Sequence, residues 1–276
     1  MESNLQAVMA RRDLLRVLVA SELRSAIARS RIGWLWWFLD PVLMMLVYWG
    51  IVVGVFDRGA ERYAPYPAFL FAALITWKHF STSVTRSLSL LRGRERLIKA
   101  IPFPTIVLPL SLVCSGFVYF VFGFVVLVVV TLLFPASRHS GNYWPMLQAP
   151  LLMAAQFAIT AGVTMVLSCL GVLFEDLKLL AAHALRITFY LSPGLFGLDM
   201  VEEKLHELPA PWGDVAYWAY LANPFAILFS GYRDAVVYGN FVPWQWWLIL
   251  VAQSALALWG GYRIYRFYDR RVIKFL

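Results

Sequence analysis

Long apolar runs, separated by short polar segments, constrain this chain more than any other feature of its sequence. Several of these runs approach or exceed the roughly 20 residues that a helix needs to cross the hydrocarbon core of a bilayer. Of the 276 residues, 61% are hydrophobic and only 14% are charged. A water-soluble domain of this length could not bury so much apolar surface. The sequence therefore predicts an all-α, polytopic membrane protein.

The apolar runs predict six transmembrane helices, at residues 34–56, 67–88, 105–134, 147–174, 182–198 and 244–262. The region between the last two runs is rich in Pro, Gly, Trp and Tyr and mixes acids with short apolar stretches. This composition favours re-entrant half-helices, whose backbone is tolerated in a membrane only where protein or water covers it. We expect a single domain over residues 1–276, in which a six-span core (34–262) lies between an N-terminal segment (1–33) and a basic tail (263–276).

The N-terminal segment is expected to form an amphipathic helix on the membrane surface. Leu15, Val19 and Leu23 recur at four-residue steps and form an apolar stripe. Glu22 interrupts this stripe, which is compatible either with an ordinary interfacial anchor or with a contact to a partner protein. The segment is polar and arginine-rich, so we expect no secretory signal and insertion driven by the first span.

Lysines and arginines are distributed unevenly between the two sides of this topology. Seventeen fall on the side of the two termini and five on the opposite side. Because cytoplasmic loops carry an excess of Lys and Arg, both termini are predicted to be cytoplasmic. The net charge of +8 then reflects topology and contact with anionic membrane lipids, and we expect no nucleic-acid partner.

The segment LLRGRERLIKAIPFPTIVLPL, residues 90–110, forms the predicted cytoplasmic loop between the second and third spans. Basic residues surround a single acid, Glu95, and lie beside Leu97 and Ile98. Three prolines then favour a sharp re-entry into the bilayer. Positive-inside charge alone could explain the basic residues, whereas a short amphipathic helix that docks a soluble partner would explain the whole mixture.

Motifs for enzymatic chemistry are missing from the sequence. It contains no G-x-x-x-x-G-K-[ST], H-E-x-x-H or G-x-S-x-G pattern, so we expect neither an ATPase nor a hydrolase, and no cofactor or metal in this chain. A membrane-bound transferase would need a catalytic cluster at a loop edge. We interpret the one such cluster, Glu202, Glu203, His206 and Glu207, as a solvated outer face.

Charge within the predicted spans is sparse. Asp40 and Arg186 lie near span ends, where their side chains can reach the membrane surface. Lys78, next to His79 near the middle of the second span, either lines a water-filled path or is neutralised by a neighbouring helix. Proton-driven carriers usually have more intramembrane acids, so the energy for any transport is expected to come from a partner.

Four stretches, in this order, resemble the membrane subunits of type-2 ABC transporters that export polysaccharides such as O-antigen, teichoic acid or capsule. They are SELRSAIARSRIGWLWWFLDP, ALITWKHFSTSV, RLIKAIPFPTIVLPL and FEDLKLL with the later YLSPGLF, ANPF and YRDAVVYG. The resemblance covers most of the chain. Two departures are Thr105, where the family often has Arg, and Asp40 before Pro41.

The resemblance implies an assembly of two permeases with two ATP-binding cassette subunits, which bind ATP and magnesium. The basic loop would contain a coupling helix that docks into the ATPase. The implied docking residues are Arg94, Glu95, Arg96, Leu97, Ile98 and Lys99, with Glu22 and Arg24 of the N-terminal helix beside them. Glu175 and Asp176 would mark a second cytoplasmic turn.

The resemblance also implies a channel between spans one and five of two copies, closed outside by a re-entrant gate over residues 199–225 and shaped by Pro193, Asn223 and Pro224. Deep aromatic side chains could let sugar rings slide along this channel, although each could equally pack the protein or face lipid. They are Tyr48, Trp49, Trp77, Phe80, Phe189 and Tyr190. The implied cargo is a lipid-linked surface polysaccharide that crosses the bacterial inner membrane, with a small lipid or drug as the alternative.

Overall fold

The computed structural model describes residues 12–27, 35–51, 63, 65–100, 103–133 and 140–275. Within these ranges every regular element is a helix, which confirms the all-α fold. The helices are α2 (Arg12–Ile27), α3 (Trp36–Trp49), α4 (Tyr66–Ser87), α5 (Leu90–Gly93), α6 (Glu95–Ala100), α7 (Val107–Leu133), the 3-10 turn η3 (Trp144–Gln148), α8 (Ala149–Leu173), α9 (Leu177–Leu191), α10 (Leu198–His206), α11 (Trp212–Tyr220), α12 (Pro224–Tyr232), the π-helical turn η4 (Arg233–Tyr238) and α13 (Trp244–Phe275).

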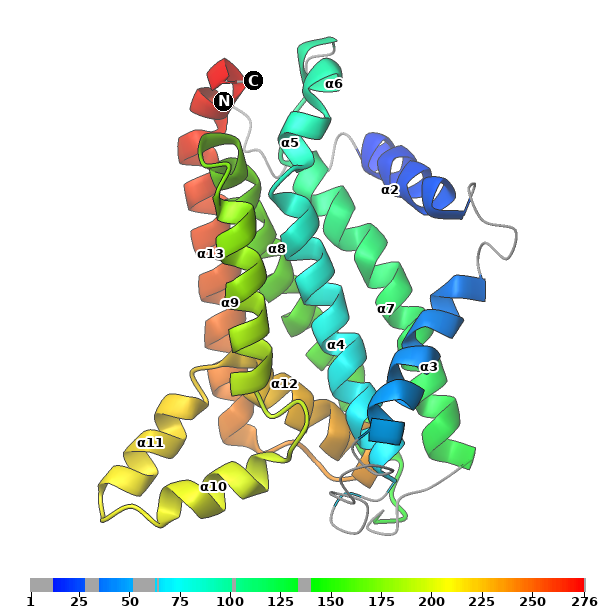
Figure 1. The fold of residues 1–276 in the computed structure, drawn as a ribbon, viewed down its shortest axis with the longest axis vertical. Coiled ribbons are helices and arrows are strands. Elements are labelled where there is room, and N and C mark those ends of the chain that lie inside the picture. The colour runs from blue at the N-terminus through cyan, green and yellow to red at the C-terminus, as the bar shows by residue number, and fades with distance from the viewer. Residues whose placement is uncertain are drawn as a thin grey trace.

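Helix α4 lies at the centre of an elongated bundle (Figure 1). It packs against α3, α7, α8, α9 and α12. Its N-terminal half is lined by small and aromatic residues that are fully buried, including Ala68, Ala72 and Phe71. The small side chains let neighbouring helices approach closely, and the aromatic rings fill the remaining space. The protein core is therefore built around this helix.

Helices α8 and α13 run side by side along one edge of the bundle (Figure 1). Gly162 of α8 faces Gly261 of α13, and a Cβ atom added to Gly261 would lie 2.6 Å from the Cα of Gly162. This distance is shorter than side chains tolerate, so glycine is what allows the two backbones to touch. The adjacent Gly260 faces open space.

Replacement of Gly261 by alanine should therefore destabilise the purified protein by about 1–3 kcal/mol, because the α8–α13 contact would be overpacked. Gly260→Ala is the matched control, since it adds the same methyl group one residue away on the same helix. It should leave the melting temperature unchanged or raise it slightly, because alanine favours helix over glycine. Equal melting temperatures for the two variants would contradict this packing.

Two of the described helical stretches are long and apolar enough to cross a membrane by length and composition, namely Val107–Leu133 and Trp144–Leu173. Helices α4 and α13 contain 22 and 32 residues but carry more polar side chains. Helices α3 and α9 have 14 and 15 residues, which at 1.5 Å per residue is short of a hydrocarbon core of about 30 Å. The count of six spans and the interfacial position of α2 remain predictions.

Two helices in the C-terminal half of the chain differ in extent from the sequence prediction. The fifth apolar helix, α9, occupies Leu177–Leu191 and not residues 182–198. It begins earlier because only Glu175 and Asp176 form the turn after α8, and it ends earlier because Ser192, which precedes Pro193, is extended. Helix α13 continues through the basic tail as far as Phe275.

The region expected to be re-entrant consists of three short helices. Helices α10 and α11 pack on each other and project from the end of the bundle that lies opposite α5 and α6 (Figure 1). Helix α12 enters the core, where Ala226 to Phe229 are fully buried. Asn223 caps α12 by accepting the amide of Phe225 at 3.0 Å, and its own amide donates to Ser192 Oγ at 2.8 Å. Pro224 occupies the first turn, where no hydrogen bond is lost.

Candidate functional site

The predicted coupling helix is a pair of short helices, α5 and α6, that extends beyond the bundle (Figure 1). Leu91 of α5 is buried and anchors the pair in an apolar cluster with Ile106 and Tyr265. In α6, Leu97 and Ile98 are half-buried against this cluster, while Arg96 and Lys99 are exposed. Their arrangement gives α6 one side that packs on its own chain and one charged side that does not.

Glu22 joins α2 to the base of this pair. Its carboxylate accepts a hydrogen bond from Arg86, which lies in the last turn of α4. It accepts a second hydrogen bond, 2.5 Å long, from Arg94, which lies between α5 and α6. The Glu22 side chain is only 11% exposed. Burial alone would raise the pKa of this carboxyl, but hydrogen bonds and charge from the two arginines more than offset burial and lower the pKa. The partners of Glu22 in the structure thus belong to its own chain.

A lowered pKa has a defined consequence for stability. The Glu22 ion pairs stabilise the fold above the ordinary carboxyl pKa of 4.5 and are lost as the pH falls through the lowered value. They are therefore fully formed at neutral pH.

Arg92 of α5 fastens the turn between α8 and α9 to the same assembly. It donates to the carboxylate of Glu175 and, at 2.7 Å, to the backbone carbonyl of Val172. The hydrogen bond from Arg92 lowers the pKa of Glu175. Three arginines thus connect α2, α4, α5–α6 and the α8–α9 turn, and we call this group of charges the arginine cluster (Arg86, Arg92 and Arg94 with Glu22 and Glu175).

The remaining docking residues lie close to this cluster but are not part of it. Glu95 pairs with Lys99 one turn later in α6 at 2.6 Å, and the bond with Lys99 lowers the pKa of Glu95. Arg24 is exposed on α2, and Asp176 is exposed in the α8–α9 turn. A docking role for these residues stays a prediction.

The Glu22–Arg94 pair can be tested by a double-mutant cycle with Glu22→Gln and Arg94→Gln. Since Arg94 is partly solvent-exposed, we expect a coupling free energy of roughly 0.5–1 kcal/mol in thermal unfolding at neutral pH. The exposed Asp13–Arg16 pair of α2 is the matched control and should give a coupling near zero. Equal couplings for the two pairs would contradict a structural role of Glu22.

Lys78 and Asp40 form an ion pair between α4 and α3. A neighbouring helix thus neutralises Lys78, which is one of the two alternatives that the sequence left open for this lysine. Asp40 is the residue that does so. Both side chains remain about half exposed. An ion pair at this depth needs its partner, because an unpaired charge in a membrane is costly.

The predicted channel aromatics separate into two groups. Trp77, Phe80 and Phe189 form one cluster with Phe225 of α12, in which Trp77 lies 5.5 Å from Phe189 and 4.9 Å from Phe225 between ring centroids. Phe80 and Phe189 are buried in this cluster, which favours packing over a channel-lining role in one copy of the chain. Tyr190 is 64% exposed.

Tyr48 and Trp49 are the two remaining channel aromatics. Tyr48 and Trp49 belong to α3, but their side chains lie outside the described part of the structure.

Sequence analysis missed a buried arginine at the opposite end of the bundle. Arg233 is 2% exposed and donates to four backbone carbonyls, those of Phe69 (3.0 Å), Pro193 (2.6 Å), Gly194 (2.6 Å) and Phe196 (3.2 Å). Its guanidinium also lies over the Phe69 ring, 3.4 Å from the centroid. The signal was a single arginine within the otherwise largely apolar stretch YRDAVVYG.

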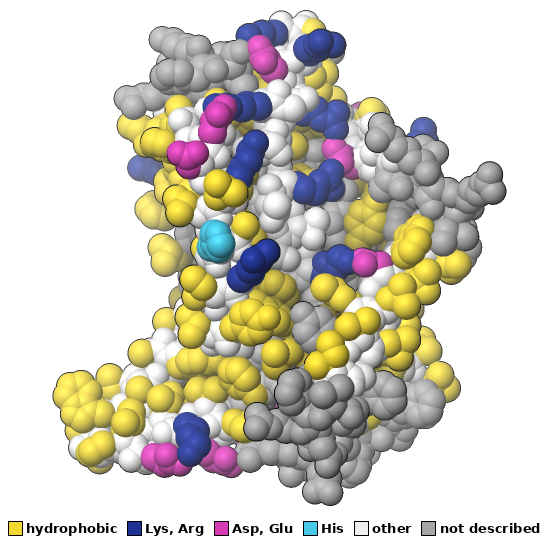
Figure 2. Space-filling view, in the orientation of Figure 1, with side chains coloured by type: hydrophobic (Ala, Val, Ile, Leu, Met, Phe, Trp, Pro, Cys, Tyr) yellow, Lys and Arg dark blue, Asp and Glu magenta, His cyan; other side chains and the backbone are white. Residues whose placement is uncertain are grey.

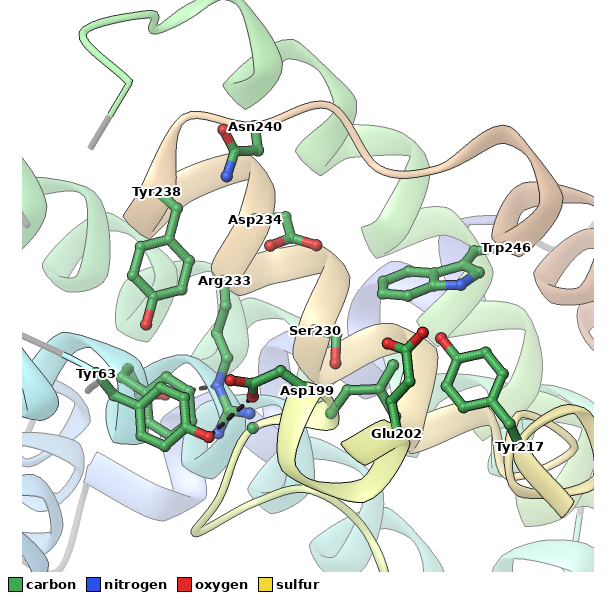
Figure 3. Close-up of a pocket in the computed structure, with 13 residues that line it drawn as sticks. Tyr63, Asp199, Glu202, Tyr217, Ser230, Arg233, Asp234, Tyr238, Asn240 and Trp246 are labelled. Atoms are coloured by element: carbon green, nitrogen blue, oxygen red, sulfur yellow. Dashed lines mark hydrogen bonds between the residues drawn. The ribbon is translucent and has the colours of Figure 1, made fainter. Parts of the chain in front are cut away.

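Next to Arg233 is a pocket of about 310 Å³ (Figure 3). Its floor includes Arg233 and Ser230, and its walls include Trp246 and Tyr217. Glu202 lies at its exposed rim, so one member of the acidic cluster on α10 faces a pocket as well as solvent. Within the described residues no group of histidines, cysteines and acids could hold a metal ion.

The comparisons with known proteins identify the family. Residues 13–237 match the family model described as ABC-2 type transporter, and the chain belongs to that family. It is therefore the membrane component of an ABC transporter, as the sequence motifs indicated.

Several known transport proteins are similar to this chain over most of its length. The chain is 29% identical over 257 residues to the O-antigen export system permease protein RfbA of Myxococcus xanthus, with 92% of both chains aligned. It is 28% identical over 228 residues to the RfbA protein of Klebsiella pneumoniae, covering 83% of this chain and 82% of the relative. It is 23% identical over 253 residues to the polysialic acid transport protein KpsM of Escherichia coli, covering 90% and 91%.

Proposed function

We propose that this chain is the membrane subunit of an ABC exporter that moves a lipid-linked cell-surface polysaccharide, of the O-antigen or capsule type, out of the bacterial cytoplasm. The observation that carries this proposal is the alignment over nearly the full chain with permeases of O-antigen and polysialic acid export. Teichoic acid is a third cargo of the same kind. The multi-pass chain would lie in the inner membrane with both termini in the cytoplasm, which the basic side of the sequence supports.

The ATP-binding partner is proposed to dock on α5 and α6. Figure 2 shows charged side chains gathered over this end of the molecule, whereas the opposite half of the same face is mainly hydrophobic. The exposed side of α6 carries Arg96 and Lys99, and Arg24 on α2 adds a further exposed charge near the same end. Two such ATPase subunits would bind ATP and magnesium and serve two copies of the permease.

The arginine cluster explains how a partner could act on the membrane part. A force applied to α6 reaches α2 and α4 through Glu22, and reaches α9 through Arg92 and Glu175. These elements would then move together as the ATPase closes. Charge-assisted hydrogen bonds between arginine and carboxylate suit this task because they are strong and directional.

The channel is proposed to lie between two copies, lined by α3 and α9. Both helices expose large apolar side chains in one copy, including Val47 on α3 and Ile187 and Tyr190 on α9. A second copy would cover part of this surface. At the outer end, the α10–α11 hairpin is proposed to act as the gate, while Pro193, Asn223 and Pro224 hold α12 in place beside it.

Docking can be tested by Arg96→Glu, which reverses a charge on the exposed side of α6. We expect loss of the ATPase subunit from the complex purified through a tag on the permease. Lys204→Glu is the matched control, because it makes the same kind of change at an exposed site on α10, at the opposite end of the bundle. Retention of the ATPase by Arg96→Glu, or equal loss from Lys204→Glu, would contradict docking at α6.

Export itself can be tested by deleting the gene and locating the lipid-linked polysaccharide. We expect the polymer to accumulate inside the cell and the surface to lose it, because the exit path is missing. Wild-type permease supplied in trans should restore the surface glycan. An unchanged surface glycan in the deletion strain would overturn the polysaccharide assignment and favour a small lipid or drug as cargo.

A further inference from the structure

The pocket beside Arg233 has a volume typical of sites for small molecules. Its volume of about 310 Å³ falls at the lower end of the range of roughly 300–1,000 Å³ for such sites. Figure 3 shows Arg233 and Tyr63 on one side, Trp246 and Tyr217 on the other, and polar groups between them. The pocket opens where α10 and α11 leave the bundle.

Ser230 supplies an independent indication of a polar ligand. Its side chain is 7% exposed, lines the pocket, and its hydroxyl has no hydrogen-bond partner among the described residues. A buried hydroxyl without a partner destabilises the fold, because it has lost its hydrogen bonds to water. A ligand with hydroxyl groups would remove this cost by bonding to the Ser230 hydroxyl.

The charges of the pocket determine which ligand it favours. Four of the five N–H donors of Arg233 bond to the backbone carbonyls described above, so most of its donors are directed away from a ligand. Asp199 and Glu202 contribute exposed carboxylates, which only accept hydrogen bonds when ionised. The pocket is therefore rich in acceptors and repels anions, and it suits an uncharged ligand with many hydroxyl donors.

The aromatic walls favour a ring. Trp246 and Tyr217 are half-buried and bring flat apolar faces beside the carboxylate of Glu202 (Figure 3). A pyranose has an apolar C–H face, which can stack on such rings, and an edge of hydroxyl groups, which can donate to the acids. Few small ligands combine both features.

We propose that this pocket binds one neutral sugar residue of the exported chain at the outer end of the permease. The inference rests on the export function proposed above. Binding here would hold the leading sugar of the glycan as it passes the α10–α11 hairpin. An acidic sugar would be disfavoured, so among the cargoes proposed above the pocket favours the neutral glycans.

Sugar binding can be measured on the purified full-length permease by saturation-transfer difference NMR. The probes are the methyl pyranosides of glucose, galactose and mannose, with N-acetylneuraminic acid as the anionic comparison. We expect saturable binding of at least one neutral probe and none of the acid. Saturable binding of the acid, or no saturable binding of any neutral probe, would overturn the proposal.

Variants separate the pocket from other aromatic surfaces. Trp246→Ala should weaken binding at least tenfold, whereas Trp244→Ala, an exposed tryptophan two residues away that does not line the pocket, should leave it unchanged. Ser230→Ala should weaken binding without lowering the melting temperature, because its hydroxyl has no protein partner to lose. Equal effects of the two tryptophan variants, or full binding by Ser230→Ala and Trp246→Ala, would overturn the assignment.

Failure of the pocket and failure of the export function give different results. If wild-type permease restores surface glycan to the deletion strain but binds none of the neutral probes, the pocket proposal fails and the export function stands. If wild-type permease restores no glycan, the export function itself fails.

Discussion

A single buried guanidinium determines how the end of the bundle beside α10 and α11 is built. Arginine stays charged in proteins, so burying Arg233 is tolerable only if its donors are satisfied. Its four carbonyl partners come from α4 and from the segment that joins α9 to α10, and the Phe69 ring covers its face. Any displacement of α12 and η4 would break several of these bonds at once. We therefore expect α12 to stay fixed. The α10–α11 hairpin packs mainly on itself, so we expect it to be the part that moves.

The opposite end uses charge in a different way. The arginines of the arginine cluster are partly exposed, only Glu22 is largely buried, and the bonds of the cluster connect separate segments of the chain. Helix α4 takes part at both ends, through Phe69 near its start and Arg86 in its last turn. The same central helix thus links the proposed ATPase surface to the outer pocket. That connection is a physical route by which work done by a soluble partner could reach the outer side of a membrane.

The sequence predicted the class, the helices and the family, because apolar runs and ordered motifs are local signals. It could not predict which charges meet, since Glu22 reaches Arg86 and Arg94 only when α2 packs on α7 in the folded bundle. Nor could it choose between packing and channel lining for Phe80 and Phe189, because α12, which packs against them, is a helix that composition alone did not place in the core. The start of α9 was predicted too late because the polar segment after the fourth span was expected to be longer than the turn that Glu175 and Asp176 form.

The division between a fixed α12 and a moving hairpin is best tested by distances between spin labels in the complete transporter, in a variant without Cys114 and Cys169. The first distance, between labels at Val215 on α11 and Leu133 at the end of α7, reports movement of the hairpin. The second distance, between labels at Phe241 and Leu133, reports movement of the segment that follows η4. All three positions are exposed. The account predicts that ATP changes the first distance and leaves the second unchanged. A change in the second distance, or a constant first distance during ATP turnover, would contradict it.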